Sequence, residues 1–190
     1  MIIRQETEYD FSQIYDFVKK AFQTANCSDG TEQDLVNKLR AGENYIPKLA
    51  LVAEDESDDG KIIGYVMLTK IAIKGIAAMP KNRFEILLLA PIAIEESRRN
   101  KGIGSTLIRE GVKRAKNEGY AAIILVGDPQ YYKQFGFVSA SNFGIKNKQK
   151  IPDGNVLVLE FVSGILDGMA GTVDFDGPDD LKNMNDASYE

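Results

Sequence analysis

The chain has 190 residues, of which 44% are hydrophobic, so a single domain with a substantial core is expected. It contains one cysteine and no histidine, which excludes a disulfide framework, zinc sites of the usual Cys/His type, and the Ser-His-Asp and Cys-His arrangements of hydrolases. No run reaches the roughly 18 apolar residues of a membrane helix, and the first residues lack a secretion signal, so a cytoplasmic protein is expected.

The formal net charge of −5 comes from 28 acidic and 23 basic residues and is unevenly distributed. Seven acidic residues and a single basic one, Lys182, lie between Gly164 and the end of the sequence. Subtracting these leaves 21 acidic and 22 basic residues in 1–163. This nearly neutral part does not disfavour an anionic cofactor. It also lacks the concentrated basic face of a nucleic-acid-binding protein.

The first part of the chain predicts a strand, two helices and a hairpin, in that order. The β-branched start predicts the strand, and apolar residues at helical spacing predict an amphipathic helix after it. A shorter helix is expected to end near Gly42, and a polar turn between two further apolar runs is a hairpin signal. The expected ranges are 2–5 for the strand, 8–26 and 31–40 for the helices, and 49–54 and 61–73 for the hairpin strands.

A dense apolar run predicts a central strand at 84–94. Pro91 cannot donate a ladder hydrogen bond there, which predicts a bulge or a local splaying of the strand. A helix is expected at 102–117, ended by Gly119, and a buried strand at 120–126 follows it. A strand, a crossover helix and a second strand predict a βαβ unit with parallel strands.

A short helix is expected next, because Asp128 can serve as its N-cap and Pro129 suits its first position. Gly136 is expected to end it. Closing strands are expected at 137–140 and 156–162.

Beyond residue 163 the glycine and aspartate content rises and the apolar periodicity disappears. The predicted domain therefore covers 1–163. Residues 164–190 are expected to form an acidic, mobile tail, for which Leu166, Met169 and Phe175 are candidate anchors.

A basic, glycine-bearing loop joins the central strand to the following helix. Gly102 and Gly104 would let backbone N–H groups approach a ligand without a Cβ in the way. The first-turn amides of a helix have no intrahelical partner, and the helix dipole favours negative charge there. Arg98, Arg99 and Lys101 add cationic side chains, so a pyrophosphate site is predicted. The alternative is that the glycines only permit tight packing and the basic residues form a solvated loop.

Two segments resemble signatures of the GNAT superfamily of N-acetyltransferases. Residues 99–104, RNKGIG, resemble the R/Q-x-x-G-x-G/A signature, and a strand precedes them as in that family. Residues 127–137, GDPQYYKQFGF, resemble the GDPxYYxxFGF form of the YhbS-like subgroup. The two motifs stand in the family's order and at a suitable separation, and the resemblance spans about residues 1–162.

The resemblance implies an α/β (α+β) fold, the GNAT acyl-CoA N-acyltransferase fold. Its mixed, mostly antiparallel central sheet of about six to seven strands is flanked by about four helices. It also implies acetyl-CoA as the acetyl donor, and no metal. Backbone groups of the central strand would hold the pantetheine arm, and loop amides would hold the pyrophosphate. The implied cofactor-binding residues are Ile92, Ala93, Ile94, Arg99, Asn100, Lys101, Gly102, Ile103, Gly104 and Ser105.

Two catalytic residues are expected. Tyr132 matches the family position whose phenol donates to the leaving CoA thiolate, and an ordinary pKa of about 10 keeps it protonated at neutral pH. The attacking amine must lose a proton, and without histidine a carboxylate or a water relay must accept it. Glu85 is the candidate base, because a carboxylate at the head of an apolar strand is costly to bury. The alternatives are a packing role for Tyr132 and an exposed strand start for Glu85.

The implied activity is that of an acyltransferase, which moves the acetyl group of acetyl-CoA directly to a primary amine of a small molecule or a protein. One alternative is a catalytically weak GNAT-fold module that binds acetyl-CoA or senses it. Another is a structural protein whose acidic tail mediates contacts. Neither nucleic acid nor membrane is an expected partner, and the sequence is compatible with a homodimer. The family builds its acceptor pocket from segments that correspond to 22–43 and 70–83, whose residues do not identify the acceptor.

Overall fold

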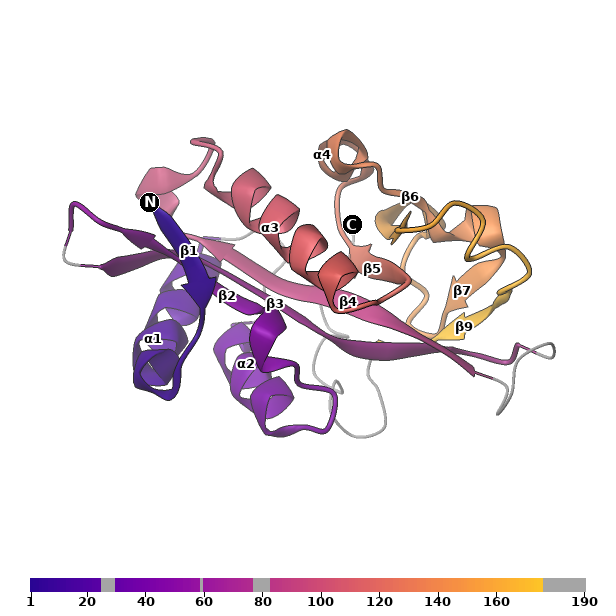
Figure 1. The fold of residues 1–190 in the computed structure, drawn as a ribbon, viewed down its shortest axis with the longest axis horizontal. Helices are drawn as coiled ribbons and strands as arrows, with labels where there is room; N and C mark the ends of the chain where they lie inside the picture. The colour runs from indigo at the N-terminus through magenta and orange to yellow at the C-terminus, as the bar shows by residue number, and fades with distance from the viewer. Residues whose placement is uncertain (25–29, 59, 77–82, 176–190) are drawn as a thin grey trace. The chain divides into compact units, whose positions relative to one another are not determined.

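The computed structural model describes residues 1–24, 30–58, 60–76 and 83–175 (Figure 1). They fall into two compact units. The first comprises Met1–Thr69 and Ala90–Ala115, and the second comprises Lys70–Leu89 and the described residues from Lys116 onward. The helices are α1 (Phe11–Phe22), α2 (Glu32–Ala41), α3 (Ile103–Asn117) and α4 (Pro129–Tyr132). Across the described ranges, no helix has the length and apolar character needed to cross a bilayer.

The described strands form a mixed, mostly antiparallel sheet, as predicted. Hydrogen bonds connect them in the order β1-β2-β3-β4-β5-β8-β6, and β9 pairs with β3 and β7. The pairs β4–β5 and β7–β9 are parallel. This part of the chain has nine strands, more than expected, because two- and three-residue strands carry no periodicity. The strands are β1 (Ile2–Gln5), β2 (Ala50–Asp55), β3 (Lys61–Lys74), β4 (Arg83–Ile94), β5 (Ala122–Val126), β6 (Val138–Ser139), β7 (Ile145–Asn147), β8 (Val156–Glu160) and β9 (Gly171–Val173).

In the first unit, α1 and α2 lie on one side of strands β1–β3, and α3 lies on the other (Figure 1). Gly64 of β3 allows α3 to pack closely. A Cβ on Gly64 would lie 2.8 Å from Leu107 Cδ1 and 3.0 Å from Ile103 Cγ2. Because Ile103 is the first residue of α3, this contact fixes where the helix begins above the sheet.

The helix expected at 8–26 is divided at its start. A 3-10 turn spans Glu8–Asp10, and α1 then runs from Phe11 to Phe22. The carboxylate of Asp10 accepts hydrogen bonds from Thr7 N and Oγ1 at 2.7 and 2.8 Å, which holds the turn. Arg4 of β1 donates to both oxygens of the same carboxylate at 2.7 Å, so the strand and the helix start share one ion pair.

A buried carboxylate, Glu6, connects α2 to the strands of the first unit. Arg40 of α2 donates to both of its oxygens at 2.9 Å, and the hydroxyls of Tyr45 and Tyr65 donate to it at 2.7 and 2.9 Å. Four charge-assisted hydrogen bonds compensate the burial of this charge. Burial, together with the neighbouring Glu6 charge, raises the pKa of both tyrosines.

In the second unit, β5 lies between β4 and β8. Its parallel partner β4 is in register through Leu87 opposite Ile123. On its other side β8 runs antiparallel, with Val126 opposite Val156. Strand β6 then pairs with β8.

The chain from residue 164 to Phe175 is part of the fold, where the sequence predicted a tail. Strand β9 places Val173 opposite Ile73 of β3, and these two side chains are fully buried. The proposed anchors Leu166 and Phe175 are also buried, whereas Met169 is half-buried. The expectation of a tail failed because β9 has only three residues and its partners are distant in the sequence. Residues 176–190 lie outside the described part of the chain.

Candidate functional site

The predicted cofactor segment lies entirely in the first unit, where β4 leads through the 3-10 turn Glu96–Arg98 into α3. Two residues of the loop have left-handed backbone conformations, Asn100 with φ 60° and Gly102 with φ 84°. Asparagine tolerates this conformation, and glycine adopts it without steric cost. A Cβ on Gly102 would meet no atom within 4 Å. The backbone conformation, and not a lack of space, therefore requires glycine at this position.

The loop ends in a helix start of the kind that binds anions. The carbonyl of Gly102 accepts hydrogen bonds from the backbone N and the hydroxyl of Thr106, both at 3.0 Å, which closes the first turn of α3. Residues 103–105 thus occupy the turn whose N–H groups have no acceptor within the helix. The helix dipole adds partial positive charge at this end. Lys101 and Gly102 are exposed, whereas Ile103 is buried.

The three basic side chains of the loop have different neighbours. Arg98 forms a 2.6 Å ion pair with Asp55, which balances its charge. Arg99 donates from Nη2 to the carbonyl of Ala21, in the last turn of α1. Lys101 is exposed to solvent. A bound anion would therefore meet the charge of Lys101 and the remaining donors of Arg99 more readily than the charge of Arg98.

Upstream of the loop, the predicted pantetheine-binding residues Ile92, Ala93 and Ile94 form the last part of β4. Ala93 is buried, and its two neighbours are half-buried. The parallel register between β4 and β5 covers Leu87 and Leu88, upstream of Pro91, whose peptide bond to Ala90 is cis. Splaying of β4 at Pro91 stays a prediction.

The candidate acid, Tyr132, lies on α4 in the second unit. The short helix begins as predicted, since the carboxylate of Asp128 accepts a hydrogen bond from Gln130 N at 2.9 Å. The side chain of Tyr132 is buried, with 8% of its surface exposed. Burial, and to a lesser degree Tyr131, raises the pKa of the Tyr132 phenol well above its ordinary value. The phenol is therefore a protonated donor throughout the neutral and mildly alkaline range.

The ring of Tyr132 has a tightly defined position. It meets Tyr131 and Phe137 edge to face, with centroids 5.1 and 5.7 Å away. Behind it stands Gly127, where an added Cβ would overlap the ring. Asn155 holds the backbone of Gly127 on both sides: its carbonyl accepts from Gly127 N at 2.9 Å, and its Nδ2 donates to Gly127 O at 3.2 Å. Nothing in the sequence singled out Asn155, which lies 28 residues from Gly127.

Glu85 does not have the buried environment that made it the candidate base. Its side chain is 42% exposed, and it forms long ion pairs with Lys70 at 3.8 Å and Arg83 at 3.6 Å. The register that sets Leu87 opposite Ile123 places Glu85 level with the start of β5. Tyr132 follows the end of β5. Along the direction of that strand, Glu85 and the start of α4 are therefore separated by the length of β5, about 13 Å. The structure does not bring these two residues together.

In the described part of the chain, no three His, Cys, Asp or Glu side chains are grouped so that they could hold a metal ion.

Comparisons with known proteins agree with these features. Residues 47–139, which contain both motifs, match the model of the acetyltransferase (GNAT) domain family. The chain is 29% identical over 175 residues to the uncharacterized N-acetyltransferase YhbS of Escherichia coli K12, an alignment that covers 92% of this chain and 96% of that protein. The similarity therefore extends beyond the 1–162 span that the motifs implied.

Solved structures show the same fold. The structure of YhbS from Escherichia coli in complex with CoA has a TM-score of 0.78 and 28% identity, covering 91% of this chain and 88% of that one. A GNAT-family acetyltransferase from Brucella melitensis in complex with acetyl-CoA has a TM-score of 0.68 and 27% identity, covering 85% of this chain and 88% of that one.

Proposed function

This chain belongs to the GNAT acetyltransferases, and on that premise we propose that it moves the acetyl group of acetyl-CoA directly onto a primary amine of a small molecule or a protein. The observation that carries the proposal is the exposed, left-handed turn at Asn100 and Gly102, which leads into the first turn of α3. Outward-facing backbone N–H groups at a helix start suit a pyrophosphate. The relatives solved with CoA and acetyl-CoA add support.

The donor set fits a CoA-type ligand in two parts. Backbone groups of Ile92 and Ile94 are proposed to pair with the pantetheine arm as an added strand would. The amides of residues 99–105 were expected to bind the pyrophosphate, but the Arg99 N–H already donates to the carbonyl of Glu96 at 3.2 Å. The amides of residues 100–105 are therefore proposed for this role, with Lys101 and the Arg99 side chain supplying charge. When bound, acetyl-CoA supplies the thioester carbonyl that the amine attacks. A backbone N–H of β4 would then stabilise the oxyanion that develops.

Tyr132 is proposed to assist departure of the CoA thiolate. An ordinary thiol has a pKa of about 8.5, below the raised pKa of the buried phenol. Complete transfer of the phenolic proton is therefore uphill, and the role that fits best is hydrogen-bond donation to the sulfur as its charge develops.

The acceptor amine must also lose a proton before it attacks. Glu85 stays in the proposal as the base, but its exposure and its ion pairs suit a relay through water better than direct contact. A Glu85→Gln variant that keeps full activity would remove it and leave water alone in this role.

The test is a screen of primary amines with acetyl-CoA, in which release of the free thiol reports turnover. Tyr132→Phe is the matched variant, because the ring keeps its shape and loses only the hydroxyl. It is expected to lower kcat about 100-fold, within the usual range for acid–base assistance, and to leave the Kd for CoA unchanged in calorimetry.

Two outcomes would contradict the proposal in different ways. CoA binding without turnover of any amine would favour a binding or sensor module. If CoA itself did not bind, both the acetyltransferase and the binding or sensor module would be excluded.

A further inference from the structure

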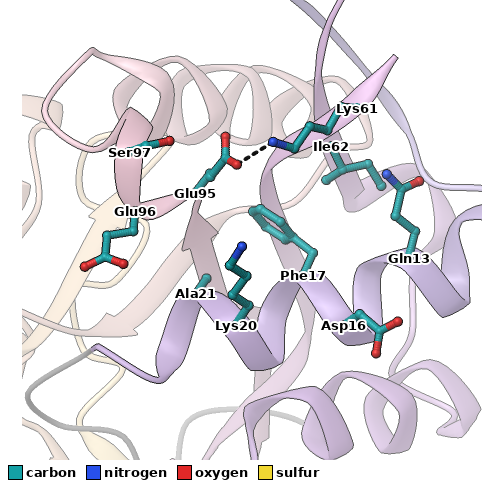
Figure 2. Close-up of a pocket in the computed structure, with 10 residues that line it drawn as sticks. All are labelled: Gln13, Asp16, Phe17, Lys20, Ala21, Lys61, Ile62, Glu95, Glu96 and Ser97. Carbon is teal, nitrogen blue, oxygen red and sulfur yellow. Dashed lines mark hydrogen bonds and ion pairs between the residues drawn. The ribbon is translucent and has the colours of Figure 1, made fainter. Parts of the chain in front are cut away.

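A cavity of about 330 Å³ lies in the first unit, next to the segment that leads into the cofactor loop (Figure 2). Its walls come from one face of α1, from the start of β3, and from residues 95–97 after β4. None of its lining residues belongs to the proposed cofactor-binding set. Its volume is within the range of small-molecule sites.

The floor of the cavity is apolar. It is formed by Phe17 and Ala21, one turn apart on α1, and by Ile62 of β3. Ile62 and Ala21 are 2% and 5% exposed, so they form a firm base, and Phe17 is half-buried above them. An apolar group placed here would be removed from water on most sides.

The rim of the cavity carries charges of both signs. Lys61 and Glu95 neutralise each other through a 2.6 Å ion pair. Lys20 of α1 extends between Phe17 and Ala21 toward the loop in Figure 2. Lys20, Asp16 of α1 and Glu96 of that loop are exposed, and none of the three forms an ion pair with another described residue. One cation and two carboxylates are thus available around the apolar floor.

We propose that this cavity binds a small zwitterion with an apolar side chain, a free α-amino acid of the leucine or phenylalanine type. Lys20 receives the carboxylate, Glu96 receives the ammonium group, and the side chain lies on Phe17 and Ile62. A ligand with a single charge could pair with rim groups of one sign only, whereas a zwitterion pairs with a group of each sign.

Two direct links connect the cavity to the cofactor loop, so a ligand in the cavity affects the loop. The carbonyl of Ala21, in the floor, accepts the hydrogen bond from Arg99, and residues 95–97 continue along the chain to Arg99. On the basis of the proposed function, the amino acid and CoA bind as coupled ligands. By reciprocity, each changes the affinity of the other by the same factor.

The site is tested by calorimetry of L-phenylalanine binding to the full chain, with no acetyl-CoA present. N-acetyl-L-phenylalanine lacks the ammonium group and L-phenylalaninol lacks the carboxylate, and each is expected to bind about three- to fivefold more weakly. Equal affinity for all three compounds would rule out the zwitterion. If L-phenylalanine does not bind at millimolar concentration, the site itself is disproved.

A pair of variants locates the binding. Lys20→Ala is expected to weaken L-phenylalanine binding about three- to fivefold, whereas Lys19→Ala, at an exposed neighbouring position that does not line the cavity, leaves it unchanged. Thermal melts of both variants check the fold. Equal affinities in the two variants would place the amino acid elsewhere, for example at the acceptor site.

The coupling is read separately, from the Kd for CoA with and without saturating L-phenylalanine. The two ligands must shift each other's Kd by one common factor, and a CoA affinity that the amino acid does not change overturns the coupling. Because L-phenylalanine binding is measured without acetyl-CoA, a failure of acetyl transfer does not count against the cavity.

Discussion

Gly127 occupies a position where the Tyr132 ring leaves room for no side chain. A Cβ there would overlap the ring, which already meets Tyr131 and Phe137 on its other sides. The backbone of Gly127 cannot readily move away, because Asn155 is hydrogen-bonded to both the N–H and the carbonyl of this residue. The hydroxyl of Tyr132 is therefore positioned by residues that do not react.

Gly127→Ala is expected to displace the phenol and to lower the rate of acetyl transfer about 10- to 100-fold, the cost of misplacing a reacting group by about 1 Å. In a Tyr132→Phe background the same substitution should add little, since the hydroxyl that it displaces is already gone. Turnover measured in the four combinations of these variants checks this.

Gly154→Ala is the control for that cycle, because its Cβ would meet no atom within 4 Å. If Gly127→Ala lowers turnover equally in both backgrounds, it disrupts the unit in general, and the positioning role of Gly127 is wrong.

At the scale of elements, the start of α3 depends on the absence of a side chain in β3. A Cβ on Gly64 would press on Leu107 and Ile103, at 2.8 and 3.0 Å. Gly64→Ala should therefore lower the free energy of unfolding by about 1–2 kcal/mol, as overpacking does. It should also weaken CoA binding, because Ile103 begins the proposed pyrophosphate-binding turn. Urea unfolding and calorimetry measure the two effects.

Gly111→Ala provides the comparison within α3. Its Cβ would lie 3.1 Å from Leu68, and replacing a helical glycine favours the helix by up to about 1 kcal/mol, which offsets the contact. Its CoA affinity should match that of the parent. Weakened CoA binding in Gly111→Ala as well would mean that the position of the whole helix, and not of its first turn, controls the site.

The sequence predicted those elements whose signals are contiguous. The apolar run of β4, the glycine-bearing loop and α3 follow one another, so they could be read together. Strand β9 could not be predicted, because a three-residue strand has no pattern and Val173 pairs with a residue 100 positions earlier. In the candidate site, too, only the contiguous features could be predicted. Residues 99–105 form a local motif, whereas the Arg99–Ala21 hydrogen bond joins positions 78 apart.

Across the whole chain, buried tyrosines link stability to alkaline pH. Burial is the largest cause that raises the pKa values of Tyr45, Tyr65 and Tyr132. In the unfolded chain a tyrosine ionises at a pH of about 10, whereas these three remain neutral there in the folded chain. Their contribution to stability is therefore complete below about pH 10 and is lost as the pH rises further.

The expected result is a free energy of unfolding that falls progressively above about pH 10, measured by urea unfolding at a series of pH values. Tyr132→Phe should reduce the steepness of this fall, since it removes one of the three groups. Tyr9→Phe, which changes a side chain that is 98% exposed, should not. Identical pH profiles for both variants would show that Tyr132 does not contribute.

Strand β9 also has a consequence for the chain as it is synthesised. Its residues leave the ribosome about 100 residues after their partners in β3, an interval of about 5–20 s at usual rates of translation. During that time β9 cannot pair with β3 or β7, and unpaired strand edges are sites of association between chains. The nascent protein is therefore open to misassembly from the emergence of β3 until the residues of β9 follow it.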